Sequence, residues 1–156
     1  MMKRMLRIGA AMMALVILLS LSLSVYASPD VLPANVASTA EGYLTLLSPE
    51  QLTTSTTSKN LPVSALAPIG TEVTVYRYNY STGNYHKIVT NNVPLEAIVG
   101  ATSLFAGRVE LTPGMNQFLI RGARDENTYT VVHFDVNVLN EGFMDRIKGV
   151  INVIFG

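Results

Sequence analysis

The stretch Ala67–Tyr78, with the sequence Ala-Pro-Ile-Gly-Thr-Glu-Val-Thr-Val-Tyr-Arg-Tyr, constrains the fold of this chain more than any other. Pro68 fixes φ near the value preferred at the second position of a turn, and Gly70 has a permissive backbone. After them, β-branched and aromatic residues run without a break, which is typical of a strand. The stretch therefore predicts a tight turn followed by a long strand that is the central partner of its neighbours.

Other short runs of strand-forming residues flank this one, separated by turn-forming residues about every eight to twelve positions. They occupy residues 43–47, 52–58, 61–67, 85–89, 95–99, 104–111, 116–123 and 128–139. The last run alternates most clearly, with Val132, Phe134, Val136 and Val138 on one side and His133, Asp135 and Asn137 on the other. One buried and one wetted face are expected for such a strand. The pattern predicts an all-β chain, an antiparallel β-sandwich of about seven strands, with a barrel as the main alternative.

The N-terminal residues 1–27 are predicted to be a signal peptide. Residues 1–7 carry three positive charges, residues 8–25 are uncharged and mostly apolar, and Val25-Tyr26-Ala27 ends on small residues as a cleavage site does. Cleavage after Ala27 would make Ser28 the new N-terminus. The alternative is a retained membrane anchor, because about 18 apolar residues can just span a bilayer. In either case we expect the rest of the chain to be secreted or to lie at the cell surface.

Residues 28–42 contain Pro29 and Pro33 and show no apolar period, so they are predicted to be an extended linker. The sandwich domain then covers 43–139. Residues 140–156 change pattern, with Asn140 as a candidate N-cap and Glu141 in the first turn. Apolar residues at helical spacing follow and predict an amphipathic helix, with an extra strand as the alternative: Phe143, Ile147, Val150, Ile151 and Ile154.

Composition excludes several kinds of site. The chain has no cysteine, which rules out disulfides, thiolate zinc sites and a cysteine nucleophile, and favours a bacterial exported protein. The first 27 residues hold three of the 11 basic residues and none of the 11 acidic ones, so the remainder is mildly acidic. A mildly acidic domain gives no electrostatic reason to expect a nucleic acid or an anionic membrane as partner.

Several pieces in sequence order resemble the bacterial immunoglobulin-like domains of cell-surface proteins. They are Ala67–Val75, Ser103–Phe105, Val109–Asn116, Ala123–Asp125 and Phe134–Val136, within a match of about 52–139. The chain departs from that family at Leu66-Ala67, where a glycine is usual, and at Asp125-Glu126-Asn127, where Gly-Asn is usual. The resemblance implies an immunoglobulin-like β-sandwich with an adhesion, spacing or substrate-binding role.

Four tyrosines are the candidate partner-binding residues. Tyr76, Tyr78 and Tyr80 alternate on one face of the central strand, and Tyr85 begins its hairpin partner. Flat apolar rings with hydroxyl groups can stack on sugars or dock a protein. The alternative is that the C-terminal helix or the other sheet covers them. The apolar stripe of the predicted helix has three possible roles: it packs on the sandwich, it lies in a membrane surface, or it is an assembly face that binds a partner or a second copy.

No catalytic or metal-binding pattern stands out. His86 and His133 lie on different strands, and Asp125 and Glu126 fit turn chemistry better than a calcium site. Serine nucleophile motifs and phosphate-binding loops are missing. We therefore expect a non-enzymatic binding or adhesion module without cofactors, whose mature chain does not span a membrane. Its expected partner is an extracellular protein or a cell-wall polysaccharide. The alternative is a structural protein of an envelope layer that uses its C-terminal helix as connector.

Overall fold

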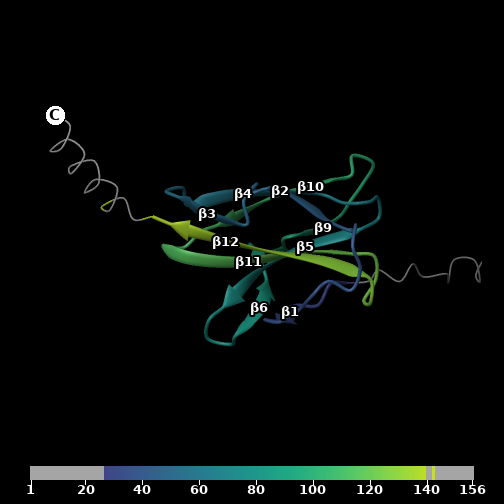
Figure 1. The fold of residues 1–156 in the computed structure, drawn as a ribbon, viewed down its shortest axis with the longest axis horizontal. Helices are drawn as coiled ribbons and strands as arrows, with labels where there is room; N and C mark the ends of the chain where they lie inside the picture. Colours follow the sequence, from purple (N-terminus) through teal and green to yellow (C-terminus); the bar gives the residue numbers. More distant parts are fainter. Residues whose placement is uncertain (1–26, 140–141, 143–156) are drawn as a thin grey trace, which may run out of the picture.

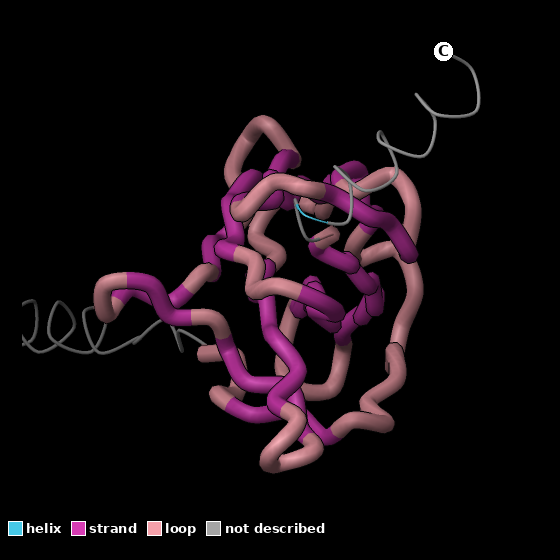
Figure 2. The backbone as a smooth tube through the Cα atoms, turned by 90° about the vertical axis from the view of Figure 1, so that its left-hand side faces the viewer, coloured by secondary structure: helices cyan, strands magenta, loops and turns pink. Residues whose placement is uncertain are grey.

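In the computed structural model, the chain is described over residues 27–139 and at residue 142, as strands joined by loops (Figures 1 and 2). The predicted signal peptide, except Ala27, lies outside the described residues. So does the predicted C-terminal helix, except Gly142, together with its whole apolar stripe. Those two assignments therefore stay predictions.

The described strands cover almost every run that the sequence pattern marks. In chain order they are β1 (Val31–Pro33), β2 (Thr45–Ser48), β3 (Thr53–Thr56), β4 (Asn60–Leu66), β5 (Glu72–Asn79), β6 (Asn84–Lys87), β7 (Val89–Thr90), β8 (Val93–Pro94), β9 (Glu96–Ile98), β10 (Leu104–Glu110), β11 (Gly114–Ala123) and β12 (Tyr129–Val138). The all-β prediction is confirmed for this part of the chain.

These strands form two main sheets and a small ladder. The large sheet has the order β1-β6-β5-β11-β12-β3, and β9 also pairs with β5. The small sheet has the order β10-β4-β2, and β7 pairs with β8 alone. Figure 1 shows the small sheet above the large one, with β1 and β6 on the opposite side.

The predicted count of about seven strands, all antiparallel, is wrong in both respects. The described residues form strands β1 to β12, and β3 runs parallel to β12. Antiparallel neighbours usually arise from hairpins, whereas β3 is joined in sequence to β2 and β4 of the small sheet. No hairpin therefore sets the direction of β3 along the edge of the large sheet.

The turn before β5 has the glycine where the sequence predicts it, but the proline stands one place earlier in the turn. The Thr71 N–H donates to the Pro68 carbonyl over 3.1 Å, so Pro68 is the first residue of the turn rather than the second. Gly70 is the third residue and has a φ of 83°, the left-handed value that a type II turn requires there. The Gly70 N–H also donates to the Val99 carbonyl over 2.8 Å, which fastens the turn to the end of β9.

The main core lies between the large and the small sheet. Val63 and Ala65 of β4 face Val73 and Val75 of β5, and the central strands β11 and β12 add further buried residues: Phe118, Ile120, Phe134 and Val136. The alternation predicted for 128–139 is therefore confirmed, because Phe134 and Val136 point into this core. Along β5, Tyr76 lies on the opposite face of the sheet from Val73 and Val75.

A second, smaller core covers the outer face of the large sheet. It consists of Leu32, Tyr76, Tyr85 and Leu119, with Val36, Tyr78 and Val131 packed against it. Residues 28–42 thus differ from the extended linker expected, because β1 pairs with β6 and Leu32 is 7% exposed. The segment binds the sheet without an apolar period, because Leu32 packs with Tyr76 and Tyr85 and the backbone of β1 pairs with β6.

Candidate functional site

Two of the four candidate tyrosines are internal. Tyr76 is 0% exposed, and its hydroxyl donates to the Pro29 carbonyl over 2.9 Å. Tyr85 is 6% exposed beneath Leu32 of β1. The prediction that all four tyrosines form one surface platform is therefore wrong. Residues 28–42, and not the other sheet, cover Tyr76 and Tyr85.

Tyr80 is the tyrosine that the fold leaves open. Its side chain is 64% exposed at the end of the β5–β6 hairpin. The Tyr78 ring meets it edge to face, with ring centroids 5.1 Å apart, and meets Tyr85 in the same way at 5.2 Å. Tyr80 thus presents an apolar ring whose position is supported from within the domain.

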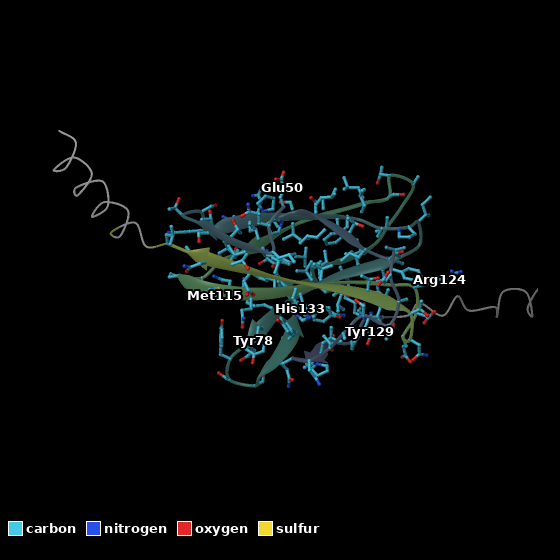
Figure 3. The ribbon with its side chains drawn as sticks, in the orientation of Figure 1. Glu50, Tyr78, Met115, Arg124, Tyr129 and His133 are labelled. Atoms are coloured by element: carbon cyan, nitrogen blue, oxygen red, sulfur yellow. The ribbon has the colours of Figure 1, made fainter. Side chains whose placement is uncertain are left out.

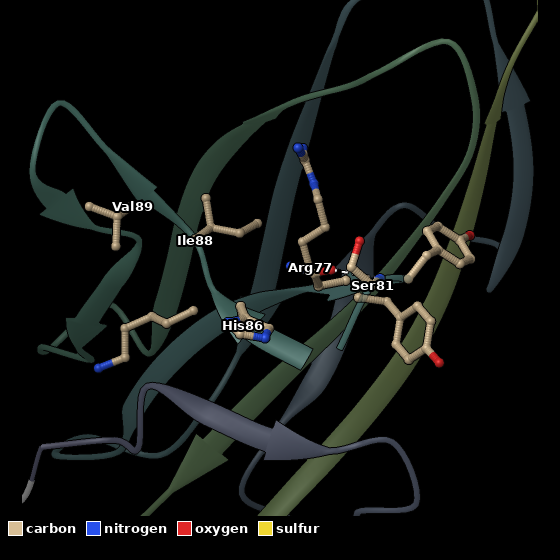
Figure 4. Close-up of a pocket in the computed structure, with 9 residues that line it drawn as sticks. Arg77, Ser81, His86, Ile88 and Val89 are labelled. Carbon is tan, nitrogen blue, oxygen red and sulfur yellow. Dashed lines mark hydrogen bonds between the residues drawn. The ribbon is translucent and has the colours of Figure 1, made fainter. Parts of the chain in front are cut away.

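An open groove of about 490 Å³ lies along the β5–β6 hairpin, and Tyr80 is among its lining residues (Figure 4). Its polar residues are Arg77, Asn79, Ser81, His86 and Lys87, and its other lining residues are Tyr78, Tyr80, Ile88 and Val89. The groove therefore combines an exposed aromatic ring, an apolar strip and several hydrogen-bonding groups, which is the usual make-up of a ligand site. We call it the Tyr80 groove.

Arg77 supplies a fixed positive charge to the Tyr80 groove. Its guanidinium lies 5.2 Å from the centre of the Phe118 ring and donates to the Glu110 carbonyl. Burial lowers the pKa of Arg77, and the nearby Glu110 charge acts in the opposite direction. An arginine held between an aromatic ring and a backbone carbonyl loses little freedom when it also meets a ligand.

His86 does not form a catalytic arrangement in the described part of the chain. Its Nε2 lies 2.8 Å from the Thr82 hydroxyl, within the turn of the hairpin. A hydroxyl nucleophile needs a base that is oriented by a third group. No other hydrogen bond to the His86 ring occurs among residues 27–139, so the pair is suited to shaping the turn.

His133 has a structural role on the outer face of the large sheet, near Tyr78 (Figure 3). Its Nε2 lies 3.3 Å from the Val36 carbonyl and its Nδ1 lies 3.1 Å from the Tyr85 hydroxyl. A carbonyl only accepts, so Nε2 carries the proton and Tyr85 donates to Nδ1. The hydrogen bonds join residues 28–42 to β12 and β6.

Replacing Tyr85 by Phe should reduce the loss of stability at alkaline pH. Burial raises the pKa of the Tyr85 hydroxyl, and the charge of Asp135 adds to the effect. Above about pH 10 the unfolded chain ionises first, so stability falls as the pH rises towards the folded-state pKa. Urea unfolding of both proteins between about pH 8 and pH 11 measures this. Equal slopes of unfolding free energy against pH in the two proteins would contradict this prediction. Some slope should remain in Tyr85→Phe, because the pKa of Lys87 is also raised and its contribution to stability is likewise lost at alkaline pH.

A charge cluster around the buried Lys87, beside the groove, is the part of the site that sequence reasoning missed. The Lys87 side chain is 8% exposed, and its Nζ lies 2.9 Å from Glu96 Oε2 and 3.4 Å from Asp30 Oδ1. It also donates to the Ser28 carbonyl over 2.7 Å. Burial alone would lower the pKa of Lys87, but the hydrogen bonds and charges of Glu96 and Asp30 outweigh it and raise the pKa.

Arg121 of the central strand β11 completes this cluster. It is 1% exposed, donates to the Ser28 hydroxyl over 3.1 Å, and its guanidinium carbon lies 4.3 Å from the centre of the Tyr129 ring. The contacts join residues up to 93 positions apart, so no local sequence pattern marks them. An arginine within an alternating strand is the one sequence signal that could have drawn notice.

The remaining predictions concern absences and turns. Within residues 27–139 and 142, no three metal-ligating side chains gather, and no helix is long and apolar enough to cross a membrane. Asp125 accepts from the Asn127 N–H over 2.9 Å, and this bond, with those to Thr128, lowers the pKa of its carboxyl. This is the turn chemistry expected from the sequence.

Comparisons with known proteins do not assign this chain to a family. No protein-family model matches the chain, and no curated protein matches it. Among solved structures, the chain is similar to the sulfur carrier protein SoxY from Chlorobium limicola f thiosulfatophilum. The two share 12% sequence identity with a TM-score of 0.41, over 64% of this chain and 77% of the other. A likeness this distant says nothing about what the chain binds.

Proposed function

We propose that the chain is an exported, non-enzymatic immunoglobulin-like module of the cell surface that binds a cell-wall polysaccharide in the Tyr80 groove. The single observation that carries the proposal is an exposed tyrosine ring in the lining of an open groove that also holds hydrogen-bonding side chains. Residues 1–27 support export through their charged start, apolar stretch and small-residue cleavage site.

Two features support an immunoglobulin-like β-sandwich. The main core is shared by the large and small sheets, as in a two-layer sandwich. The Pro-Ile-Gly-Thr turn that resembles the family leads into β5, an interior strand of the large sheet. The parallel pairing of β3 with β12 departs from the purely antiparallel sheets of the common form.

The chemistry of the groove favours a sugar as ligand. A pyranose ring has an apolar face of C–H groups that packs on a flat aromatic ring such as Tyr80, and hydroxyls around its rim. Asn79, Ser81 and Arg77 offer donors and acceptors for those hydroxyls along the same groove. The groove is open to solvent, which leaves room for the rest of a polysaccharide chain.

Replacing Tyr80 by Ser tests the proposal. We expect the variant to bind purified insoluble cell-wall polysaccharide at least about tenfold more weakly in sedimentation assays, because the stacking surface is lost. Ile69→Ser is the matched control: Ile69 is 68% exposed, close to the 64% of Tyr80, and does not line the groove. The control should bind like the unchanged protein.

Two outcomes would contradict the proposal. One is polysaccharide binding that is the same for Tyr80→Ser and Ile69→Ser. The other is binding to an envelope fraction that protease treatment removes and polysaccharide digestion leaves intact, which identifies a protein as the partner. Thermal unfolding of both variants should match the unchanged protein, because exposed substitutions change stability by only about 0.5 kcal/mol.

A further inference from the structure

Ser28 is held in the fold through all of its polar atoms. Its N–H donates to Glu72 Oε1 over 3.0 Å, its carbonyl accepts from Lys87 Nζ over 2.7 Å, and its hydroxyl accepts from Arg121 over 3.1 Å. Ser28 is 3% exposed, whereas Ala27 directly before it is exposed. Ser28 is therefore a single buried residue, with exposed Ala27 before it and exposed Pro29, Asp30 and Val31 after it.

Glu72 has hydrogen-bonding capacity that the intact peptide does not use. Its Oε1 accepts from the Ser28 N–H, but its Oε2 is buried and has no hydrogen-bond partner in the described part of the chain. A buried carboxylate oxygen without a partner is costly. A peptide nitrogen has one hydrogen to donate, whereas an α-ammonium group has three.

We infer that Ser28 is the mature N-terminus, and that its free ammonium group forms a buried ion pair with both oxygens of Glu72. This rests on the export proposed above. Hydrolysis of the Ala27–Ser28 peptide bond by a signal peptidase adds one water molecule. It leaves a carboxylate on Ala27 and an amine on Ser28, which takes up a proton.

The charges around Ser28 agree with this assignment. In the uncleaved chain, Ser28 lies beside the cations Lys87 and Arg121 and beside the carboxylate of Glu72, and Lys87 also pairs with Glu96 and with the largely exposed Asp30. A new ammonium on Ser28 brings three positive charges against three negative ones. Cleavage at the position that the signal sequence marks thus balances the cluster that the fold builds there.

Two independent measurements test the inference. First, the full chain is expressed with its leader in a bacterial host, and the exported product is analysed by intact mass and N-terminal sequencing. We expect a start at Ser28; a start at any other residue would overturn the assigned position. Binding to polysaccharide plays no part in this readout, so failure of the proposed ligand does not affect it.

Second, thermal unfolding is compared for two chains that both end at Gly156 and begin at Ser28 or at Ala27. The Ser28 chain should unfold at a temperature higher by roughly 3–8 °C, the shift that one strong interaction produces in a domain of this size. Glu72→Gln should remove the difference, whereas Glu50→Gln, at an exposed glutamate beside the small sheet (Figure 3), should preserve it.

The pH dependence separates an ammonium ion pair from simple packing. An α-amino group ordinarily has a pKa of about 7.7–8.0, so its charge is present at neutral pH and is lost in alkaline solution. The advantage of the Ser28 chain should therefore be full near pH 7 and vanish as the pH rises through the folded-state pKa of the amine. Equal unfolding temperatures at pH 7, or a difference that survives Glu72→Gln, would overturn the inference.

Discussion

Removing residues 28–42 is expected to destabilise the domain by roughly 4–6 kcal/mol, a large share of the stability of about 5–15 kcal/mol that is typical of a domain. The segment contributes the buried Leu32 to the second core and the strand β1 to the large sheet. Its loss would also leave Lys87 without Asp30 and Arg121 without the Ser28 hydroxyl. Tyr76 and Tyr85 would become exposed on the outer face of the sheet.

A single substitution measures the same effect if the shortened chain fails to fold. Leu32→Ala should cost about 2–3 kcal/mol in urea unfolding, because Leu32 is 7% exposed among Tyr76, Tyr85 and Leu119. Val31→Ala is the matched control, since Val31 is its neighbour in β1 and is 45% exposed. Equal and small effects of the two substitutions would mean that the segment does not pack on the sheet in solution.

Replacing Phe118 by Ala should destabilise the protein by about 3–5 kcal/mol. Phe118 is 0% exposed in the central strand β11, and its ring stacks on Phe134 with centroids 5.2 Å apart. The Arg77 guanidinium lies against the same ring, so the substitution removes packing in the main core and loosens a charge of the Tyr80 groove. Chemical denaturation measures the first effect, and polysaccharide binding measures the second.

Two variants control for this prediction. Phe118→Leu keeps most of the volume and should cost under about 2 kcal/mol. Met115→Ala, on the same strand but 48% exposed, should change stability by no more than about 0.5 kcal/mol. A loss of unfolding free energy of less than about 1 kcal/mol for Phe118→Ala would contradict this prediction, because it would be close to the effect expected at the exposed Met115. It would show that β11 is not central to the core.

Local pattern was enough to predict most of the strands, but not β1, β7 or β8. Phe134 and Val136 lie in the main core, on the side that the alternation of 128–139 marks as apolar. Gly70 has the positive φ that a turn there requires. These features depend on the period of a strand and on the geometry of one turn, both of which are local.

The contacts that define the candidate site are not local, and the sequence pattern missed them. Residues 28–42 contain one buried apolar side chain in a strand, Leu32, and a single residue makes no period to recognise. The cover that they form over Tyr76 depends on a hydrogen bond to Pro29, 47 positions away. Lys87 looks like an ordinary surface residue in sequence, and only the fold surrounds it with Asp30 and Glu96.

The tyrosine face is therefore divided between two roles. Tyr76 and Tyr85 anchor the N-terminal segment, whereas Tyr80 opens on the groove with Tyr78 behind it. Substitutions at the first pair should act on stability, and substitution at Tyr80 should act on binding. A replacement of several tyrosines at once would mix these two effects.

The most direct test is the dissociation constant for soluble fragments of the cell-wall polysaccharide, measured by calorimetric titration of the unchanged protein, Tyr80→Ser and Ile69→Ser. If the polysaccharide binds in the Tyr80 groove, the dissociation constant should be at least about tenfold larger for Tyr80→Ser and unchanged for Ile69→Ser. Equal constants for all three proteins, or no measurable binding by the unchanged protein, would contradict it.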